Sequence, residues 1–136
     1  MSYEFNITLQ GSFDDVVEKV RAVLMDEQLG IVSEVNVQAI FKNKMDKDIP
    51  PYRIFGACNP KLASQIIEVE PNAGTLLPCN FILYESAPGS VVVSFMDPVT
   101  VLGLAQSDAA HEVGKAAKEK LLRVIDKLSA HQESAT

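Results

Sequence analysis

Residues that usually carry redox or catalytic chemistry are scarce in this sequence. Its 136 residues include no tryptophan, only two cysteines and only two histidines. Basic residues are also few. The sequence has 12 lysines and arginines and 18 acidic residues, which gives a formal net charge of −6. A negative charge disfavours non-specific attraction to nucleic acid or to an anionic membrane surface. The composition therefore predicts no nucleic-acid partner and no membrane partner.

Long hydrophobic runs are missing as well. No stretch approaches the roughly 18 uninterrupted apolar residues of a membrane-spanning helix, and residues 1–10 lack the basic start and apolar run of a secretory signal. Two cysteines in a chain long enough to bury a core without disulfides fit a reducing compartment. We therefore expect a cytoplasmic protein.

Familiar catalytic motifs are absent too. The sequence has no G-x-G-x-x-G, P-loop or G-x-S-x-G pattern, and its cysteines do not have C-x-x-C spacing. His111 stands near Asp108 and Glu112, but Lys115 occupies the place of the second histidine of an H-E-x-x-H motif. We therefore expect His111 to be an exposed surface residue, predict no metal site, and can name no cofactor. A non-enzyme is favoured.

What the sequence does contain is regular hydrophobic periodicity. Residues 3–10 alternate between apolar and polar, which predicts a half-buried strand. An S-x-x-D capping pattern at residues 12–15 opens an amphipathic helix, which Gly30 is expected to end as a left-handed cap. The period of two returns over residues 31–41 and predicts a second strand.

The middle of the chain predicts three more strands and a short helix. Residues 43–51 are expected to form a loop or a brief helical turn, and residues 52–57 a strand. The Asn-Pro step at residues 59–60 fits the cap and first position of a short helix. Residues 77–86 and 90–96, joined by Ala-Pro-Gly, are expected to form a hairpin. The buried stripe of the short helix is expected at Leu62, Ile66 and Val69.

A long helix beginning at Ser107 or Asp108 is expected to complete a single domain over residues 1–136, with residues 130–136 frayed. The predicted order is β-α-β-β-α-β-β-α. Because the first two strands alternate, one sheet face should be wet and the other should pack under helices. We therefore predict a two-layer α+β fold with a mainly antiparallel five-stranded sheet. The expected core positions of the long helix are Ala109, Val113, Ala116, Leu121, Val124 and Leu128.

Two Cys-Asn pairs at predicted strand boundaries define the candidate site. Cys58 precedes a helix N-terminus, whose free N–H groups favour a thiolate of lowered pKa. If the strands that carry Cys58 and Cys79 are neighbours, the thiols could form a redox pair, bind a soft metal or contact a thiophilic ligand. The alternative is that both thiols are small buried hydrophobes, with Asn59 as a helix cap and Asn80 as a turn residue.

Tyr52 and Arg53 stand at the start of the strand that leads to the first Cys-Asn pair. Tyr52 can stack on a ligand, and Arg53 can clamp a carboxylate or a phosphate. The alternative is a solvated loop followed by a strand-edge arginine. The candidate ligand-contacting residues are therefore Tyr52, Arg53, Cys58, Asn59, Cys79 and Asn80.

Four runs of sequence carry a family resemblance. They are V-N-V-Q-A at residues 35–39, P-P-Y-R-I-F-G-A-C-N-P at 50–60, L-P-C-N at 77–80 and D-P at 97–98. In this order and spacing they resemble the bacterial and archaeal family called domain of unknown function 302, over nearly the whole chain. The resemblance implies a fold similar to the TATA-box-binding-protein-like β-α-β(4)-α arrangement, often as a homodimer. It implies no established activity and no catalytic residues.

Together these observations predict a non-catalytic ligand-binding or assembly module. Its expected partners are a second copy of the chain and a small-molecule ligand. The alternative function is a thiol-based redox or sulfur-transfer protein that uses Cys58 and Cys79.

Overall fold

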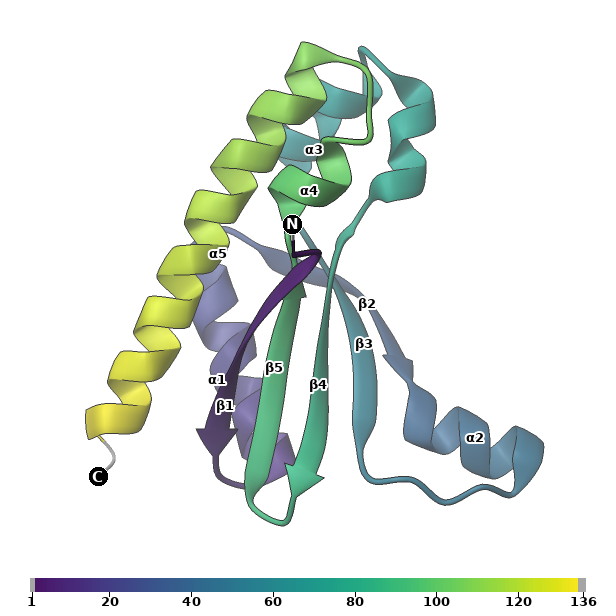
Figure 1. The fold of residues 1–136 in the computed structure, drawn as a ribbon, viewed down its shortest axis with the longest axis vertical. Helices are drawn as coiled ribbons and strands as arrows, with labels where there is room; N and C mark the ends of the chain where they lie inside the picture. Colours follow the sequence, from purple (N-terminus) through teal and green to yellow (C-terminus); the bar gives the residue numbers. More distant parts are fainter. Residues whose placement is uncertain (1, 135–136) are drawn as a thin grey trace.

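The computed structural model describes residues 2–134, which form a five-stranded antiparallel sheet with helices packed on one face (Figure 1). The order of the strands across the sheet is β1-β5-β4-β3-β2. This architecture confirms the predicted two-layer α+β fold. The strands are β1 (Glu4–Gln10), β2 (Gly30–Asn36), β3 (Tyr52–Cys58), β4 (Cys79–Ala87) and β5 (Ser90–Met96).

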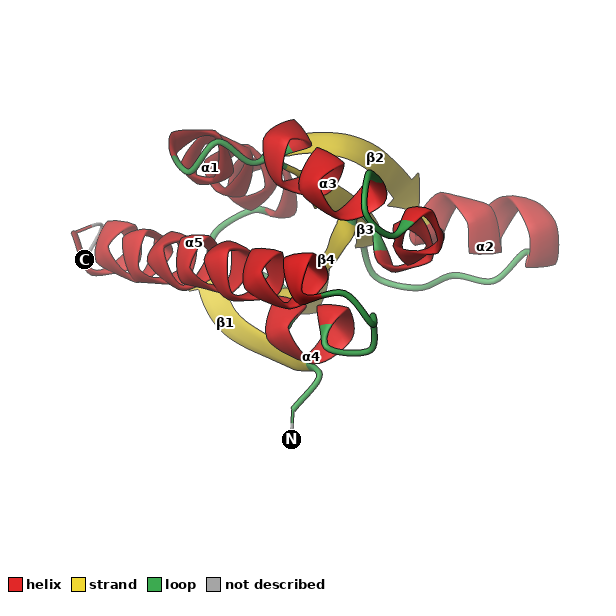
Figure 2. Cartoon of the chain, turned by 90° about the horizontal axis from the view of Figure 1, so that it is seen from above, coloured by secondary structure: helices red, strands yellow, loops and turns green. Residues whose placement is uncertain are grey.

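The helices lie on one side of the sheet, with one exception (Figure 2). The long helix α5 runs beside α1, and α3 and α4 pack near its beginning, whereas α2 extends away from the body beyond β2. No helix in the described part of the chain is long and apolar enough to cross a membrane. The helices are α1 (Phe13–Asp26), α2 (Val37–Met45), α3 (Pro60–Ile67), α4 (Pro98–Leu102) and α5 (Asp108–Ser134), with a 3-10 helix, η1, over Pro71–Leu76.

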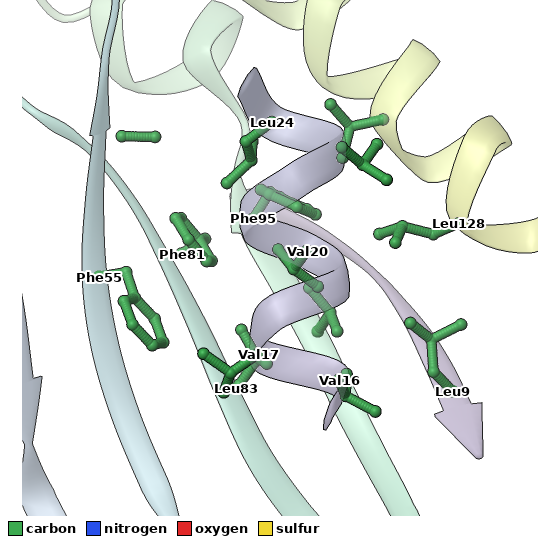
Figure 3. Close-up of a cluster of buried hydrophobic side chains, with 14 of the residues drawn as sticks. Leu9, Val16, Val17, Val20, Leu24, Phe55, Phe81, Leu83, Phe95 and Leu128 are labelled. Atoms are coloured by element: carbon green, nitrogen blue, oxygen red, sulfur yellow. The ribbon is translucent and has the colours of Figure 1, made fainter. Parts of the chain in front are cut away.

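The main core lies between the sheet and helices α1 and α5 (Figure 3). The period of two in β3, β4 and β5 directs Phe55, Phe81 and Phe95 to this side, where their rings stack with centroids 5.0 and 5.3 Å apart. Val20 and Leu24 of α1 cover these rings. Each such side chain contributes roughly 1.5–3 kcal/mol to folding through burial. This core fixes which sheet face is covered and which is left open.

A second, smaller core joins α3, η1 and α4 to the beginning of α5. Gly114 of α5 makes this packing possible, because a Cβ atom there would lie 2.8 Å from the carbonyl oxygen of Pro98 in α4. The buried residues of this second core are Ile66, Ala73, Leu102, Ala105, Ala110 and Val113.

Side-chain caps begin helices α1, α3 and α4, the first two where the sequence predicted them. Ser12 Oγ accepts a hydrogen bond from the Asp15 backbone N–H at 3.2 Å, which begins α1. Asn59 caps α3 in the same way, and Asp97 Oδ1 accepts from Val99 N–H at 2.9 Å to begin α4. These caps satisfy N–H groups that have no partner inside the helix.

The first predicted helix and the second predicted strand both end earlier than expected. Helix α1 ends at Asp26, and the left-handed residue after it is Gln28, with φ 62°, whereas Gly30 begins β2. The predicted cap at Gly30 is therefore wrong. The predicted strand through residue 41 is also wrong beyond Asn36, because Asn36 Oδ1 accepts from Ala39 N–H at 3.0 Å and begins α2. Helix α2 then occupies the start of the predicted 43–51 loop.

The core-facing stripe of α5 differs from the prediction near the beginning of the helix. Ala110 and Ala117 are buried, whereas the predicted Ala109 and Ala116 are only partly buried. The reason is the second core, because α4 and η1 cover the first turns of α5 and set which face points inward. The other predicted core positions, Val113, Leu121, Val124 and Leu128, are confirmed.

Two further differences concern the ends of elements. Val69 is 65% exposed, because α3 ends at Ile67 and the predicted stripe does not extend beyond the helix. Helix α5 extends to Ser134, so residues 130–134 of the segment predicted to fray have helical backbone. Neither glycine nor proline follows Gly114 to end the helix. Residues 135–136 of the predicted frayed segment lie outside the described residues.

Candidate functional site

The predicted site residues divide between the two faces of the sheet. Helices α1, α3 and α5 gather on one side (Figure 2), where Cys58, Asn59 and Cys79 line a small cavity. Tyr52 and Asn80 line a larger hollow on the open side. We call the first the thiol cavity and the second the sheet hollow.

The thiol cavity brings the two cysteines together. Cys79 lies directly opposite Ala57 in the β3–β4 pairing, and Cys58 is the next residue along β3. Both line a cavity of about 30 Å³ that α3 and α5 cover with Leu62 and Val113. This volume has room for little more than a water molecule.

Both thiols are held in their neutral form, and neither takes part in a disulfide. Burial raises the pKa of Cys58. Burial, and secondarily the neighbouring Cys58 thiol, raises the pKa of Cys79 to about 11. The interpretation of Cys58 as a thiol of lowered pKa is therefore wrong.

Asn59 caps the helix that follows Cys58. Its Oδ1 accepts a hydrogen bond from Leu62 N–H at 3.1 Å, which is the capping interaction of α3. Its Nδ2 donates to the carbonyl oxygen of Gln28 at 3.1 Å. Asn59 therefore joins α3 to the turn before β2 and satisfies one of the free N–H groups at the beginning of the helix.

Arg53 belongs to neither cavity. Its Nη1 lies 3.1 Å from Glu34 Oε2 and its Nη2 lies 3.8 Å from Asp14 Oδ1. Its guanidinium also lies over the Phe13 ring, 5.3 Å from the centroid. Arg53 thus links β3 to β2 and to the beginning of α1, and its charge is already matched by carboxylates.

His111 differs from its predicted exposed position. The residue is half-buried, and its Nε2 lies 2.8 Å from the carbonyl oxygen of Ala105. This contact ties the first turn of α5 to the loop that precedes it. Among residues 2–134, no three histidine, cysteine or acidic side chains lie together as a metal-binding group.

The sheet hollow has a volume of about 400 Å³ and extends over four strands of the open face. Tyr52 of β3 and Tyr84 of β4 are direct cross-strand partners, and their rings stack with centroids 5.7 Å apart and an interplanar angle of 16°. Beside this pair, Ser94 of β5 lies opposite both Ile82 of β4 and Asn6 of β1. The hollow is lined by Tyr3, Glu4, Asn6, Tyr52, Asn80, Phe81, Ile82, Tyr84, Val92, Ser94 and Met96.

One carboxylate gives the sheet hollow its charge. Glu4 accepts hydrogen bonds from Ser94 Oγ at 2.5 Å and from Asn6 Nδ2 at 3.0 Å. The bond from Ser94, followed by the bond from Asn6, lowers the pKa of Glu4. No lysine or arginine is among the lining residues, so the hollow combines an apolar and aromatic floor with a single negative charge.

Sequence reasoning found only part of this hollow. It named Tyr52 and Asn80 but missed Glu4, Tyr84 and Ser94. The signal that was available is the alternation of β1, which places Glu4 and Asn6 on the same face. The position of Tyr84 and Ser94 beside them depends on the pairing of β1, β5 and β4, which the alternation of single strands does not reveal.

A solved structure and a family model are similar to this chain over nearly its whole length. No curated protein matches the sequence. The crystal structure of an uncharacterized conserved DUF302 protein from Bacillus stearothermophilus is 19% identical in sequence, with a TM-score of 0.84 over 94% of this chain and 99% of that chain. The family model described as domain of unknown function DUF302 matches residues 5–128. That match spans nearly the whole fold, from β1 to Leu128 of α5, so the chain belongs to the DUF302 family.

Proposed function

We propose that the chain is a non-catalytic binding module that holds a small molecule in the sheet hollow. The observation that carries the proposal is a ligand-sized hollow on the sheet face that no helix covers. Its volume of about 400 Å³ falls within the range of roughly 300–1,000 Å³ that is typical of ligand pockets. Its lining is mainly apolar and aromatic with a few convergent polar groups, which is the usual composition of such sites.

The thiol cavity supports a function less well. Its volume of about 30 Å³ leaves no room for a ligand larger than water. Thiol exchange and sulfur transfer begin with a thiolate, whereas the pKa of both cysteines is raised. The thiols are better explained as small, half-buried side chains that pack under α3 and α5.

Tyrosine fluorescence provides the experiment. The chain has no tryptophan, and its three tyrosines all line the hollow, so intrinsic fluorescence reports on this surface. We expect members of a library of small aromatic compounds to change that fluorescence and to shift the backbone amide NMR signals of β1, β4 and β5. Ser94→Arg should fill the hollow and weaken such binding by about tenfold or more, which corresponds to roughly 1.4 kcal/mol.

A matched variant separates this effect from a general change of charge. Ser86→Arg introduces the same side chain on β4, at an exposed residue outside the hollow, and should leave affinity unchanged. Equal binding by the wild type and Ser94→Arg would place the ligand elsewhere. A library without any binder would also contradict the proposal.

Assembly as a homodimer is a second candidate function, and helix α2 favours it. This helix has no buried residue, although Val37, Ile40, Phe41 and Met45 recur at the spacing of one apolar helix face. It follows the edge strand β2, whose Val32 is also exposed. A second copy would bury this surface through a two-fold interface, in agreement with the dimer that the family resemblance implies. Sedimentation over a range of protein concentrations tests this assembly.

A further inference from the structure

We propose that the sheet hollow selects an organic cation, namely an ammonium group attached to an apolar or aromatic body. This inference rests on the proposed function and names the class of its ligand. Three features of the hollow carry it: its aromatic rings, its carboxylate and the distance between them along the strands.

The aromatic side chains of the hollow are suited to a cation. All three tyrosines of the chain, Tyr3, Tyr52 and Tyr84, line it. The negative face of an aromatic ring attracts an ammonium group within about 6 Å of its centroid. The nearly parallel pair of Tyr52 and Tyr84 also offers an edge and a flat surface against which an aromatic ligand body can pack.

The charge in the hollow has the complementary sign. Ser94 and Asn6 hold the Glu4 carboxylate in place and lower its pKa, so that it is ionised at neutral pH. Within residues 2–134, no lysine or arginine forms an ion pair with Glu4 or lines the hollow. The Glu4 carboxylate would repel an anionic ligand, because no basic side chain of the hollow offsets its charge. The net charge of −6 would repel such a ligand as well.

The strand register sets the separation between charge and rings. The Glu4 carboxylate reaches Ser94, which is paired with Ile82 of β4. Tyr84 lies two residues further along β4, a rise of roughly 7 Å. A ligand whose ammonium group contacts Glu4 would therefore lay its body over Ile82 and Val92 toward the tyrosine pair. This length corresponds to an arylethylamine.

Three probes that share one skeleton test the selection of charge. They are 2-phenylethylammonium, the neutral 2-phenylethanol and the anion phenylacetate, each titrated into the full chain at neutral pH and low salt and followed by tyrosine fluorescence. We expect the ammonium probe to bind roughly fivefold more tightly than the alcohol, as a partly exposed charge pair allows. Phenylacetate should bind more weakly than either, and added salt should reduce the differences.

Glu4→Gln identifies the source of the preference, because glutamine keeps an acceptor for Ser94 and removes only the charge. This variant should bind the ammonium probe and the alcohol with nearly equal affinity, and thermal unfolding should show that it is folded. Glu18→Gln makes the same change on α1, where Glu18 pairs with Arg21, and should keep the fivefold preference.

The outcomes distinguish failure of the cation proposal from failure of the proposed binding function. If all three probes bind the wild type equally, or if Glu4→Gln keeps the preference, the cation proposal fails while the hollow remains a binding site. If none of the three probes changes tyrosine fluorescence or NMR signals, the cation proposal fails, and the compound library then decides whether the hollow binds any ligand.

Discussion

At the scale of single residues, the two thiols lie at neighbouring strand ends, because Cys58 follows the residue that lies opposite Cys79. The pKa of a thiol depends on burial, which is set by α3 and α5 packing over the strands, and here burial outweighs the favourable field of a helix N-terminus.

We predict that both thiols of the native protein react slowly with iodoacetamide near pH 8, and that Cys79 is the slower. Because the pKa of Cys79 is raised to about 11, its thiolate fraction should be about a hundredfold lower than that of an ordinary cysteine, whose pKa is roughly 8.5–9. Mass spectrometry of timed samples measures both sites, and Cys58→Ser isolates Cys79. Unfolding in urea should make labelling fast, whereas rapid native labelling of Cys79 would restore the thiol-based alternative.

At the scale of elements, a buried carboxylate joins the two main helices. Glu27 follows the last residue of α1, and its side chain is only 9% exposed. Arg123 Nε and Lys127 Nζ of α5 lie 2.8 and 2.9 Å from its carboxylate oxygens, and Lys120 Nζ donates to its carbonyl oxygen at 3.1 Å. These cations also interact favourably with the negative C-terminal end of the α1 dipole.

We predict that Glu27→Gln makes the protein less stable at pH 7 by roughly 1–2 kcal/mol. The substitution removes the buried negative charge that pairs with Arg123 and Lys127, and the effect is moderate because these two cations are partly exposed. The bonds from Lys127 and then Arg123 lower the pKa of Glu27, so the folded state binds this proton less readily than the unfolded state. The stabilisation is therefore present above the ordinary glutamate value of about 4.3 and is lost as the pH falls below it.

Urea unfolding followed by circular dichroism at pH values from 7 to 3 measures this effect. The difference in the free energy of unfolding between wild type and Glu27→Gln should shrink as the solution is acidified. Glu18→Gln serves as the control, because Glu18 is exposed and pairs only across one helical turn. A difference that stays constant with pH would show that Glu27 acts through packing and not through its charge.

The elements themselves were predictable where local pattern and tertiary packing agree. The alternation of β1 and the hairpin of β4 and β5 were predicted correctly, as were the caps at Ser12 and Asn59. Residues 35–41 were misread, since their alternation fits a strand as well as one helix face, and the capping bond of Asn36 selects the helix. The stripe of α5 was misread at its beginning because α4 and η1 decide which face is covered.

At the scale of the whole molecule, sequence predicted two layers but not where a ligand could bind. The prediction placed the site at the strand boundaries that carry the two Cys-Asn pairs. The larger hollow lies on the opposite face and needs residues from β1, β3, β4 and β5. These strands are neighbours only through the order β1-β5-β4-β3-β2, which pairs the first strand with the last.

The same strand order leaves β2 at an edge of the sheet, followed by α2, which suggests how two copies would meet. Ile40 and Met45, at the two margins of the apolar stripe of α2, are 44% and 57% exposed. Large apolar side chains gathered on one surface are typical of an interface. We predict that the wild type sediments as a dimer at micromolar concentration and that Ile40→Glu weakens the dimer by about tenfold or more, since a charge buried at an apolar contact is costly.

Leu104→Glu is the matched control for this prediction. Leu104 is 75% exposed in the loop before α5, in another part of the molecule from α2, so its substitution should leave the dimer intact. Circular dichroism should show that both variants keep the fold, because neither position belongs to a core. A wild type that remains monomeric at all concentrations, or equal effects of the two substitutions, would argue against α2 as the contact. Because α2 does not line the sheet hollow, Ile40→Glu should still bind the ligands of the hollow, and the two proposed functions can be tested independently.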